Sequence, residues 1–517
     1  MGRYNYRRRS NKSGSISVQV YKSDINGQRH IKTMGTGQTE SELLELEKEA
    51  RAYICDLTGE REFNFDEQPY DRIEEDPSVI YSKPVVSSEG PELILGKLFD
   101  EVGFGVIDEP LFRSIVLSRL VYPASKLKTT EYLYYHKRKE IEVSQIYRFL
   151  DWFYENVQER VQDIAYNWTK NLLGGKVNVL SYDMTTLHFE SDDEDDLKKI
   201  GYSKNGKFQS PQIMLGLLVS TNGYPIGYNI YPGNTYEGHT LVPILESMTS
   251  KYNLGKPVII ADSGLLSKEN MKELERAGYK FIIGARIKSE SPAWQSKILE
   301  QFQEPKDGSS ISFDKGKNNR LIVNYSERRA KRDFHNRNRG IARLQKNFSS
   351  GKITKKSINN RGYNKLLSIT GGKDIKIIID EEKIALDAKW DGLKGYVTNS
   401  ELSPQEVIDN YKQLWNIEKA FRISKTDLRV RPIYHYRQRR IEAHICIAFV
   451  AYAIFKELER RIAEDKSITF SVYKAIEMTK TIFKVTMTSK KTKKTFTSFA
   501  DISNDQATLL RFMGYKV

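Results

Sequence analysis

The alternation of apolar strands and helices between residues 173 and 285 constrains the fold of this chain most. Three short apolar runs come first, then a helical segment, a fourth apolar run, a second helical segment and a last apolar run. Their strand and helix periods predict the order β-β-β-α-β-α-β. We therefore expect an α/β fold with a mixed sheet, in which an antiparallel meander is followed by strands that connect through helices.

Two of these apolar runs end in an aspartate. The run "VNVLSYD" ends at Asp183, and "KPVIIADSG" contains Asp262. If the two strands are parallel neighbours, the carboxylates lie about one strand spacing, ~5 Å, apart at one edge of the sheet. Carboxylate oxygens in a basic protein suit Mg²⁺, which keeps water and phosphate as further ligands. The alternative is that each aspartate forms a turn or caps a helix, because a Ser-Gly turn signal follows Asp262.

A third acid comes from a helix that we predict near residues 403–428. The start "SPQE" combines a Ser cap, a proline in the first turn and the glutamate of a capping box. On this helix Glu418 shares one face, at helical spacing, with a phenol, a leucine and two cations: Tyr411, Leu414, Arg422 and Lys425. Two-metal phosphodiester chemistry needs a bridging carboxylate and at least one more ligand, which Glu418 can supply.

The charge and the composition narrow the class of protein. The chain has 517 residues, enough for about two to four domains. It has 82 Lys+Arg against 67 Asp+Glu, a net charge of +15, which makes nucleic acid the first candidate partner. A merely soluble basic protein explains the charge alone about equally well. Two distant cysteines fit a reducing cytoplasm. The apolar stretch 445–455 is too short to span a bilayer, and the basic N-terminus lacks the apolar core of a secretory signal, so we expect no membrane partner.

Composition also divides the chain into regions. We expect a basic arm, a hairpin around Asn26-Gly27 and a helix in residues 1–90, followed by a helical domain in residues 91–172. The α/β core covers residues 173–285 and 399–435, and a β-rich, basic subdomain is inserted between them at 286–398. We expect residues 436–517 to be helical and to be a candidate region for oligomerisation.

Several basic residues outside the acidic constellation are candidates for DNA contact. Lys204 and Lys207 follow an acidic cluster, and a phosphate contact and a plain surface loop are equally good interpretations of them. The basic run of the insertion is too dense for an ordinary exposed helix face, so we favour DNA contact for Arg328, Arg329 and Arg332. Trp294 and Trp390, also in the insertion, are predicted to pack in a core; the alternative is that one of them stacks on an extruded DNA base.

Four segments together resemble the DDE transposases of bacterial insertion sequences: "YDMTTLHFE", "GYSKNGKFQSPQIMLGLLVSTNGYPIGYNIYPGN", "IIADSGLLSKENMKELERAGYKFIIGAR" and "YKQLWNIEKAFRISKTDLRVRPIYH". The resemblance is to the group with a Tyr-x2-Arg-x3-Glu-x6-Lys (YREK) signature and a β-rich insertion before the last acid. Tyr411, Glu418 and Lys425 match this signature, whereas Leu414 stands at the arginine position. Arg422, one turn beyond Glu418, is our candidate for the phosphate contact of the missing arginine.

The resemblance implies an RNase H-like catalytic core in which Asp183, Asp262 and Glu418 bind Mg²⁺, with Mn²⁺ as a substitute. It also implies that Tyr411, Arg422 and Lys425 lie near DNA phosphates. The implied function is binding of terminal inverted repeats in residues 1–90, followed by metal-dependent strand cleavage and transfer. The implied partners are double-stranded DNA of the element ends and the target, and a second copy of the chain in the end-paired complex. We expect a cytoplasmic, nucleoid-associated bacterial protein; the alternatives are a stand-alone RNase H-like nuclease and a non-catalytic DNA-binding protein derived from a transposase.

Overall fold

The computed structural model describes most of the chain, namely residues 3–11, 14–24, 27–58, 82–190, 192–203, 209–262, 264, 268–350, 359, 362–370, 376–490 and 493–517. The chain divides into two compact units. One contains residues 1–101, 105–146 and 457–517, and the other contains residues 102–104 and 147–456.

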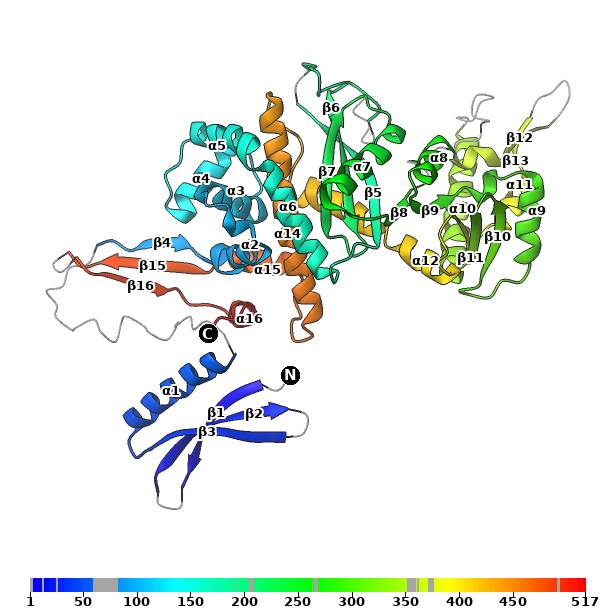
Figure 1. Ribbon diagram of the computed structural model, residues 1–517. Helices are drawn as coiled ribbons and strands as arrows, with labels where there is room; N and C mark the ends of the chain where they lie inside the picture. The colour runs from blue at the N-terminus through cyan, green and yellow to red at the C-terminus, as the bar shows by residue number, and fades with distance from the viewer. Residues whose placement is uncertain are drawn as a thin grey trace. The chain divides into compact units, whose positions relative to one another are not determined.

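The second unit is built on a mixed sheet that has eight strands within the described residues, in the order β10-β11-β14-β9-β8-β5-β6-β7 (Figure 1). The strands are β5 (Val179–His188), β6 (Gln212–Ser220), β7 (Pro225–Pro232), β8 (Val258–Ala261), β9 (Lys280–Ala285), β10 (Ser310–Gly316), β11 (Asn319–Tyr325) and β14 (Leu393–Thr398). β5, β8 and β9 are parallel to one another, and the other pairings are antiparallel. With α7 (Leu241–Tyr252) and α8 (Lys268–Arg276) between the strands, the predicted order β-β-β-α-β-α-β is confirmed.

Both faces of this sheet are covered, which is why β6 is buried along its whole length. On one face, alternate residues of β5 such as Leu180, Tyr182 and Met184 join the core cluster of α7 and α8. On the other face, Thr185 and Leu187 line a cavity together with residues between Phe421 and Tyr452, most of which are helical. The helices of this unit are α6 (Gln158–Leu172), α9 (Pro292–Gln301), α10 (Glu327–Ser349), α11 (Glu381–Ala388), α12 (Pro404–Lys412), α13 (Trp415–Arg422), the π-helix η8 (Ile423–Asp427) and short 3-10 turns at Glu237–His239, Ile287–Ser289 and Gly362–Leu366.

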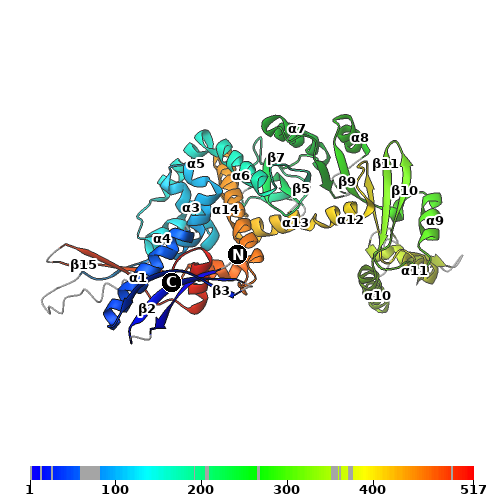
Figure 2. The same cartoon turned by 60° about the horizontal axis from the view of Figure 1, so that its bottom comes forward.

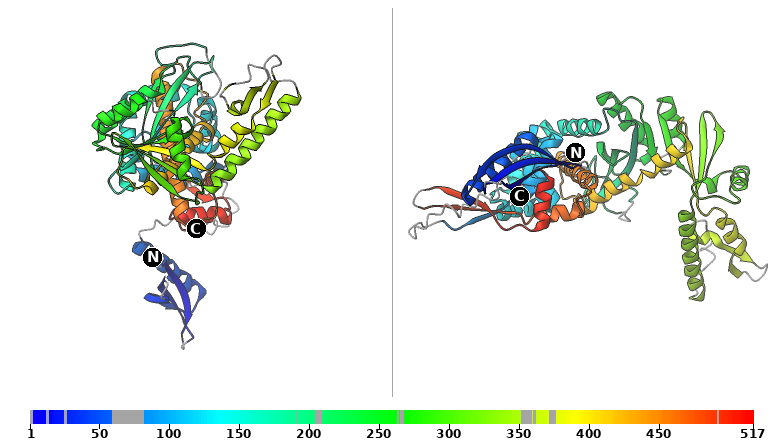
Figure 3. Two further views of the ribbon diagram at one scale, coloured as in Figure 1. Left: turned by 90° about the vertical axis from the view of Figure 1, so that its right-hand side faces the viewer. Right: turned by 90° about the horizontal axis from the view of Figure 1, so that it is seen from below.

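Residues 286–398 contribute to the main sheet as well as forming a smaller cluster. β10, β11 and β14 extend the sheet beyond β9, and α9 packs on them through an apolar cluster that contains Trp390, with Trp294 packed against it. Core packing is therefore confirmed for both tryptophans. α10, α11 and the hairpin of β12 (Leu367–Thr370) and β13 (Lys376–Ile379) form a second cluster of their own (Figure 3, yellow-green).

The first unit begins with a three-stranded sheet of described residues, β1 (Arg3–Ser10), β2 (Ile16–Asp24) and β3 (Gly27–Gly37), on which α1 (Glu40–Thr58) packs. The hairpin predicted around Asn26-Gly27 is confirmed by the pairing of β2 with β3. The basic arm is itself a strand, in which the ring of Tyr4 lies against Lys22 of β2 and the ring of Tyr6 lies against Arg51 of α1.

The C-terminal region is not wholly helical, and the prediction for residues 436–517 is corrected in this respect. β15 (Phe483–Thr488) pairs with both β16 (Thr495–Phe499) and β4 (Val85–Ser88), because β-branched and aromatic residues alternate in these segments. The remaining helices are η2 (Glu92–Gly96), α2 (Lys97–Val102), η3 (Phe104–Val106), α3 (Pro110–Val121), α4 (Lys126–Lys137), α5 (Val143–Asn156), α14 (Gln438–Glu464), α15 (Val472–Thr479) and α16 (Asn504–Phe512).

The longest apolar stretch lies inside α14. Residues 445–455 are buried there, as predicted for a helix that packs in a protein core. Within the described residues, we find no helix whose length and apolar character would let it cross a bilayer.

Candidate active site

The two predicted aspartates belong to neighbouring strands, because β5 and β8 pair in parallel from Val179 beside Val258 to Ser181 beside Ile260. Asp262 directly follows the last residue of β8, as predicted. Asp183 does not end its strand, and this prediction is corrected: β5 continues to His188, because the apolar and β-branched residues after Asp183 extend the pairing with β6. The register of β5 and β8, extended by two residues, would bring Asp183 opposite Asp262. Asp183 is half-buried and Asp262 is exposed. Because alternate residues of a strand face the same side, Asp183 shares the face of Thr185, which is the face that α13 covers.

Two consecutive helices, α12 and then α13, which carries Glu418, run across this face (Figure 2). α12 contacts β9 and β14, and α13 contacts β5 and β6. The predicted capping box of α12 is confirmed, with Ser403 and Glu406 bonded to each other's backbone and Pro404 in the first turn. Asn416 anchors α13 by donating from Nδ2 to the carbonyl of Thr221, 2.6 Å away, in the turn between β6 and β7. Glu418 is exposed on α13, one turn before its end.

The segment 404–427 is not one regular helix, which changes the face that we predicted. It breaks between Lys412 and Trp415 and ends in the π-helix η8. A π-helix turns less per residue than an α-helix, so Lys425 leaves the face of Glu418. Leu414, at the break, is 8% exposed and packs in the core. The five residues that share a face at ideal helical spacing therefore do not do so here.

Tyr411 is buried and its hydroxyl forms a hydrogen bond with Asp262. It is 6% exposed, and its hydroxyl donates to Oδ1 of Asp262 at 3.4 Å. Burial, and next the negative charge of Asp262, raise the pKa of the Tyr411 phenol, so it stays protonated and remains a donor. Gly284 of β9 leaves room for this hydroxyl, since a Cβ at that position would collide with it. The placement favours orientation of Asp262 over the direct phosphate contact that we predicted for Tyr411.

Lys394 lies at this site and was missed by the sequence reasoning. Its Nζ is 4.3 Å from the ring centroid of Tyr411 and 5.5 Å from that of Tyr396. Burial, followed by the positive charge of Arg329, lowers the pKa of Lys394 to about 8, while the carboxylates of Asp262 and Glu418 oppose this shift. The signal in the sequence is a single lysine within the strand "LKGYVT", where only small, apolar and aromatic neighbours are expected.

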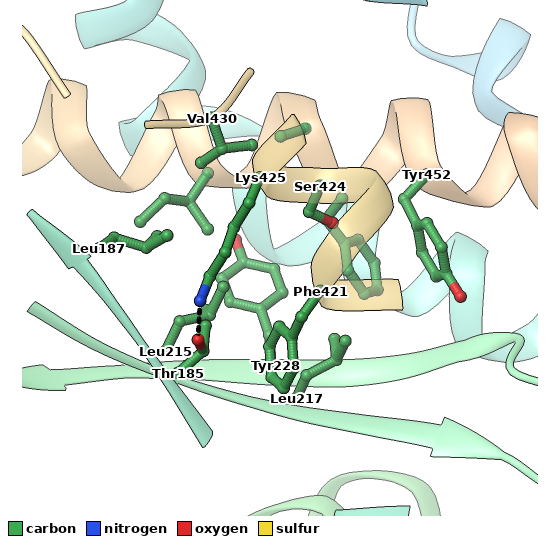
Figure 4. Close-up of a pocket in the computed structure, with 13 residues that line it drawn as sticks. Thr185, Leu187, Leu215, Leu217, Tyr228, Phe421, Ser424, Lys425, Val430 and Tyr452 are labelled. Carbon is green, nitrogen blue, oxygen red and sulfur yellow. Dashed lines mark hydrogen bonds between the residues drawn. The ribbon is translucent and has the colours of Figure 1, made fainter. Parts of the chain in front are cut away.

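Lys425 points inward, toward β5. Its Nζ donates to Oγ1 of Thr185 at the mouth of a mainly apolar cavity, and it lies 5.8 Å from the ring of Phe421 (Figure 4). The cavity is lined by residues of β5, β6, β7, α13, η8 and α14, and by Val430, which lies between η8 and α14. This ammonium therefore links η8 to the strand that carries Asp183, two residues before Thr185.

The other predicted DNA contacts have different placements. Arg422 is exposed on α13, Arg328 and Arg332 are exposed on α10, and Arg329 is half-buried. Of the rest of that basic run, Arg337 is buried in an ion pair with Asp391, at 2.5 Å, so it belongs to the core and not to a DNA-binding surface. Lys204 and Lys207 lie outside the described residues.

The acids fit Mg²⁺ in their chemistry, since paired carboxylate oxygens are the donors that this ion prefers. The charges of Asp262 and Glu418 both influence the pKa values of Tyr411 and Lys394, and Asp183 lies on β5, the strand that pairs with β8 just before Asp262. In the part of the chain that the structure describes, however, no three His, Cys, Asp or Glu side chains are close enough together to bind one ion. The fold thus gathers the acids in one region without drawing all three to a single point.

Comparison with known proteins identifies the family. A family model described as a transposase DDE domain matches residues 175–454, more than half of the chain. The chain belongs to the DDE transposase family. One solved structure similar to this transposase is a piggyBac transposase synaptic complex with hairpin DNA, with 9% sequence identity, a TM-score of 0.38 and coverage of 76% of this chain and 77% of that one. No curated protein sequence matches the transposase.

Lys425→Met should slow strand cleavage by the transposase about tenfold or more and leave DNA affinity within about twofold. Methionine keeps the packing of the long side chain but loses the bond to Thr185, and small misplacements of catalytic groups cost large factors in rate. Thr185→Val removes the other partner and should have the same effect, with no further loss in the double variant. Cleavage rates from pre-assembled complexes and binding titrations provide the test. Weaker binding with an unchanged cleavage rate would instead assign Lys425 the phosphate contact that the sequence predicted.

Proposed function

We propose that this chain is the transposase of a bacterial insertion sequence of the YREK group, which binds the terminal inverted repeats of its element, cleaves the strands and joins them to a target. The observation that supports the proposal most directly is the parallel pairing of β5 with β8, because its register, extended by two residues, would bring Asp183 beside Asp262 on the face covered by α13. The order β7-β6-β5-β8-β9, a meander followed by parallel strands, supports an RNase H-like core.

In the proposed mechanism Asp183, Asp262 and Glu418 would hold Mg²⁺. When bound, the metal would activate the attacking oxygen and stabilise the leaving oxygen of the phosphodiester. Tyr411 keeps the Asp262 carboxylate oriented through its hydroxyl, and it does not act as a nucleophile. The exposed cations Arg422, Arg328 and Arg332, in a chain of net charge +15, hold the DNA backbone.

Excision in cells tests this function. A plasmid that carries the coding sequence with its flanking genomic DNA should lose the segment between two inverted repeats when the chain is expressed, and the segment should reappear elsewhere. Sequencing of the junctions identifies the ends. Cutting at the ends without any joined product would favour the stand-alone nuclease, and binding of the ends without cutting would favour the non-catalytic DNA-binding protein.

We further propose that the N-terminal region recognises the element ends. Residues 3–58 carry an apolar core of their own, formed by Val18, Val20 and Leu43 among others, and their first strand presents exposed arginines: Arg7, Arg8 and Arg9. Arg8 is already paired with Glu47 at 2.6 Å, whereas Arg7 lies over the ring of Tyr21, 5.1 Å from its centroid. This compact, basic piece precedes the catalytic core, as an end-binding module would.

Removal of residues 1–58 should therefore abolish most of the preference for end DNA. We expect affinity for a duplex of the mapped end to fall at least about tenfold, because base contacts supply specificity while the charge of the remaining chain supports only non-specific binding. Affinity for an unrelated duplex of equal length should change far less. Titrations of both duplexes at several salt concentrations measure this difference, and an unaltered preference in the shortened chain would place end recognition elsewhere.

A further inference from the structure

Lys394 is a half-buried cation that contacts two aromatic rings near the predicted acids. It lies on β14, which reaches the site from the segment between the second and third acids, with Asn324 of β11 as its cross-strand partner. The rings of Tyr411 and Tyr396, 4.9 Å apart and inclined at 61°, both lie near its ammonium group. Cation–π contacts of this kind restrict the long side chain to one direction.

The charges around Lys394 leave its ammonium poorly compensated. Within the described residues it forms no ion pair and no hydrogen bond, although Asp262 and Glu418 act on it from a distance. Arg329 and Arg332 add positive charge nearby, and both lower the pKa of Lys394. Taking an ammonium partly out of water without a direct partner costs free energy, which an anionic ligand at this position would offset.

The substrate of the proposed function carries such an anion at every nucleotide. The arginine that the family signature places near Tyr411 is absent, because Leu414 occupies the position and is 8% exposed. Lys394 brings a positive charge to the same tyrosine. It precedes Tyr411 in the chain and lies on a strand, whereas the arginine of the signature would follow Tyr411 on a helix. Lysine binds phosphate as a compact point charge, so it needs no planar, bidentate partner.

We propose that Lys394 binds a backbone phosphate of the DNA strand being cut, adjacent to the acids, and so aligns the scissile bond. The inference rests on the proposed function and adds a substrate contact that the family signature does not contain. Its charge acts at the reacting strand, and the many exposed cations of the chain supply overall affinity. Loss of Lys394 therefore affects the rate of cleavage more than binding.

The first experiment compares two substitutions in the full-length chain. Lys394→Met keeps a long apolar stem between the two tyrosines and removes the charge, whereas Lys394→Arg keeps the charge. Lys256→Met is the matched control, because Lys256 also lies over a tyrosine ring, 4.1 Å from that of Tyr279, but precedes β8 at the end opposite to Asp262. The probe is a duplex of the element end mapped by excision, cleaved in Mg²⁺ under single-turnover conditions.

We expect Lys394→Met to cleave at least about tenfold more slowly than the wild type, with melting temperature and duplex affinity close to those of the wild type. Lys394→Arg should retain most of the rate, and Lys256→Met should match the wild type. Equal losses in Lys394→Met and Lys394→Arg would indicate a packing role and overturn the inference, as would a wild-type rate in Lys394→Met. If the wild-type chain itself does not cleave, the proposed function fails. If the wild type cleaves and Lys394→Met cleaves at the same rate, only the inference fails.

Single uncharged phosphates locate the contact. Methylphosphonate is placed at one backbone position at a time around the cut, and both proteins are assayed on each duplex. At the phosphate bound by Lys394, the neutral linkage should slow the wild type about tenfold and leave Lys394→Met unchanged, because the interaction is already lost. Equal slowing of both proteins at every position would exclude a phosphate contact by Lys394.

Discussion

Replacement of Asp183 or Asp262 by asparagine, or of Glu418 by glutamine, should abolish strand cleavage while the DNA ends still bind. Each change removes a charged oxygen ligand with little change of shape, and it removes no cation from the DNA-binding surface. Loss of a group on which transition-state charge depends costs about 10³-fold in rate or more. The melting temperature should stay close to that of the wild type, because none of the three side chains is fully buried.

The assay measures cleavage of pre-bound ends in Mg²⁺, and a parallel titration measures binding. Mn²⁺ should also support cleavage, and Ca²⁺ should support binding only. Asp193→Asn is a suitable control, because Asp193 is an exposed acid in the loop after β5. Any of the three variants that cleaves pre-bound ends at nearly the wild-type rate would remove that residue from the proposed triad.

Leu414→Arg should destabilise the chain by about 3 kcal/mol and should not restore a missing phosphate contact. Leu414 is 8% exposed at the break between α12 and α13, so an arginine there would be desolvated without a carboxylate partner. Arg422→Ala, by contrast, changes an exposed residue and should leave the melting temperature unaltered. The arginine of the family signature thus cannot be added back to this backbone at low cost.

Thermal melting of both single variants and of the double variant provides the measurement. Gln413→Arg is the control for added positive charge, since Gln413 is the adjacent residue of the same break and is more exposed. A double variant that melts like the wild type and cleaves faster than Arg422→Ala would show that the two positions exchange function. That result would contradict the placement of Leu414 in the core.

Local sequence patterns predicted much of the fold. The strand and helix periods between residues 173 and 285 predicted the element order, and the capping signals at Ser403 predicted where α12 begins. These succeed because hydrogen bonding and side-chain periodicity within a few residues decide them. The same logic placed Asp262 correctly at the end of β8, whereas Asp183 lies in the middle of β5, which continues to His188. The condition that the two strands are parallel neighbours is met.

Features that depend on distant partners were predicted less well. The helical period put Lys425 on the face of Glu418, but η8 redirects it to Thr185, which is 240 residues away in the sequence. The insertion was predicted only as a β-rich, basic subdomain, and the continuation of the main sheet by three of its strands was not anticipated. No local pattern encodes a π-turn or the strand that a distant segment pairs with.

The sequence by itself determined the alternating α/β core, the position of Asp262 at the end of its strand and the family signature around Glu418, because these follow from short-range periodicity and spacing. Only the tertiary structure decided that Tyr411 donates to Asp262 and that Lys394 stands between two tyrosines beside the acids. It also decided that Leu414 is buried and not a site for arginine. The physical reason is that burial and charge neighbourhood arise from strand pairing and helix packing over more than a hundred residues, and these set which polar groups meet and which lose water.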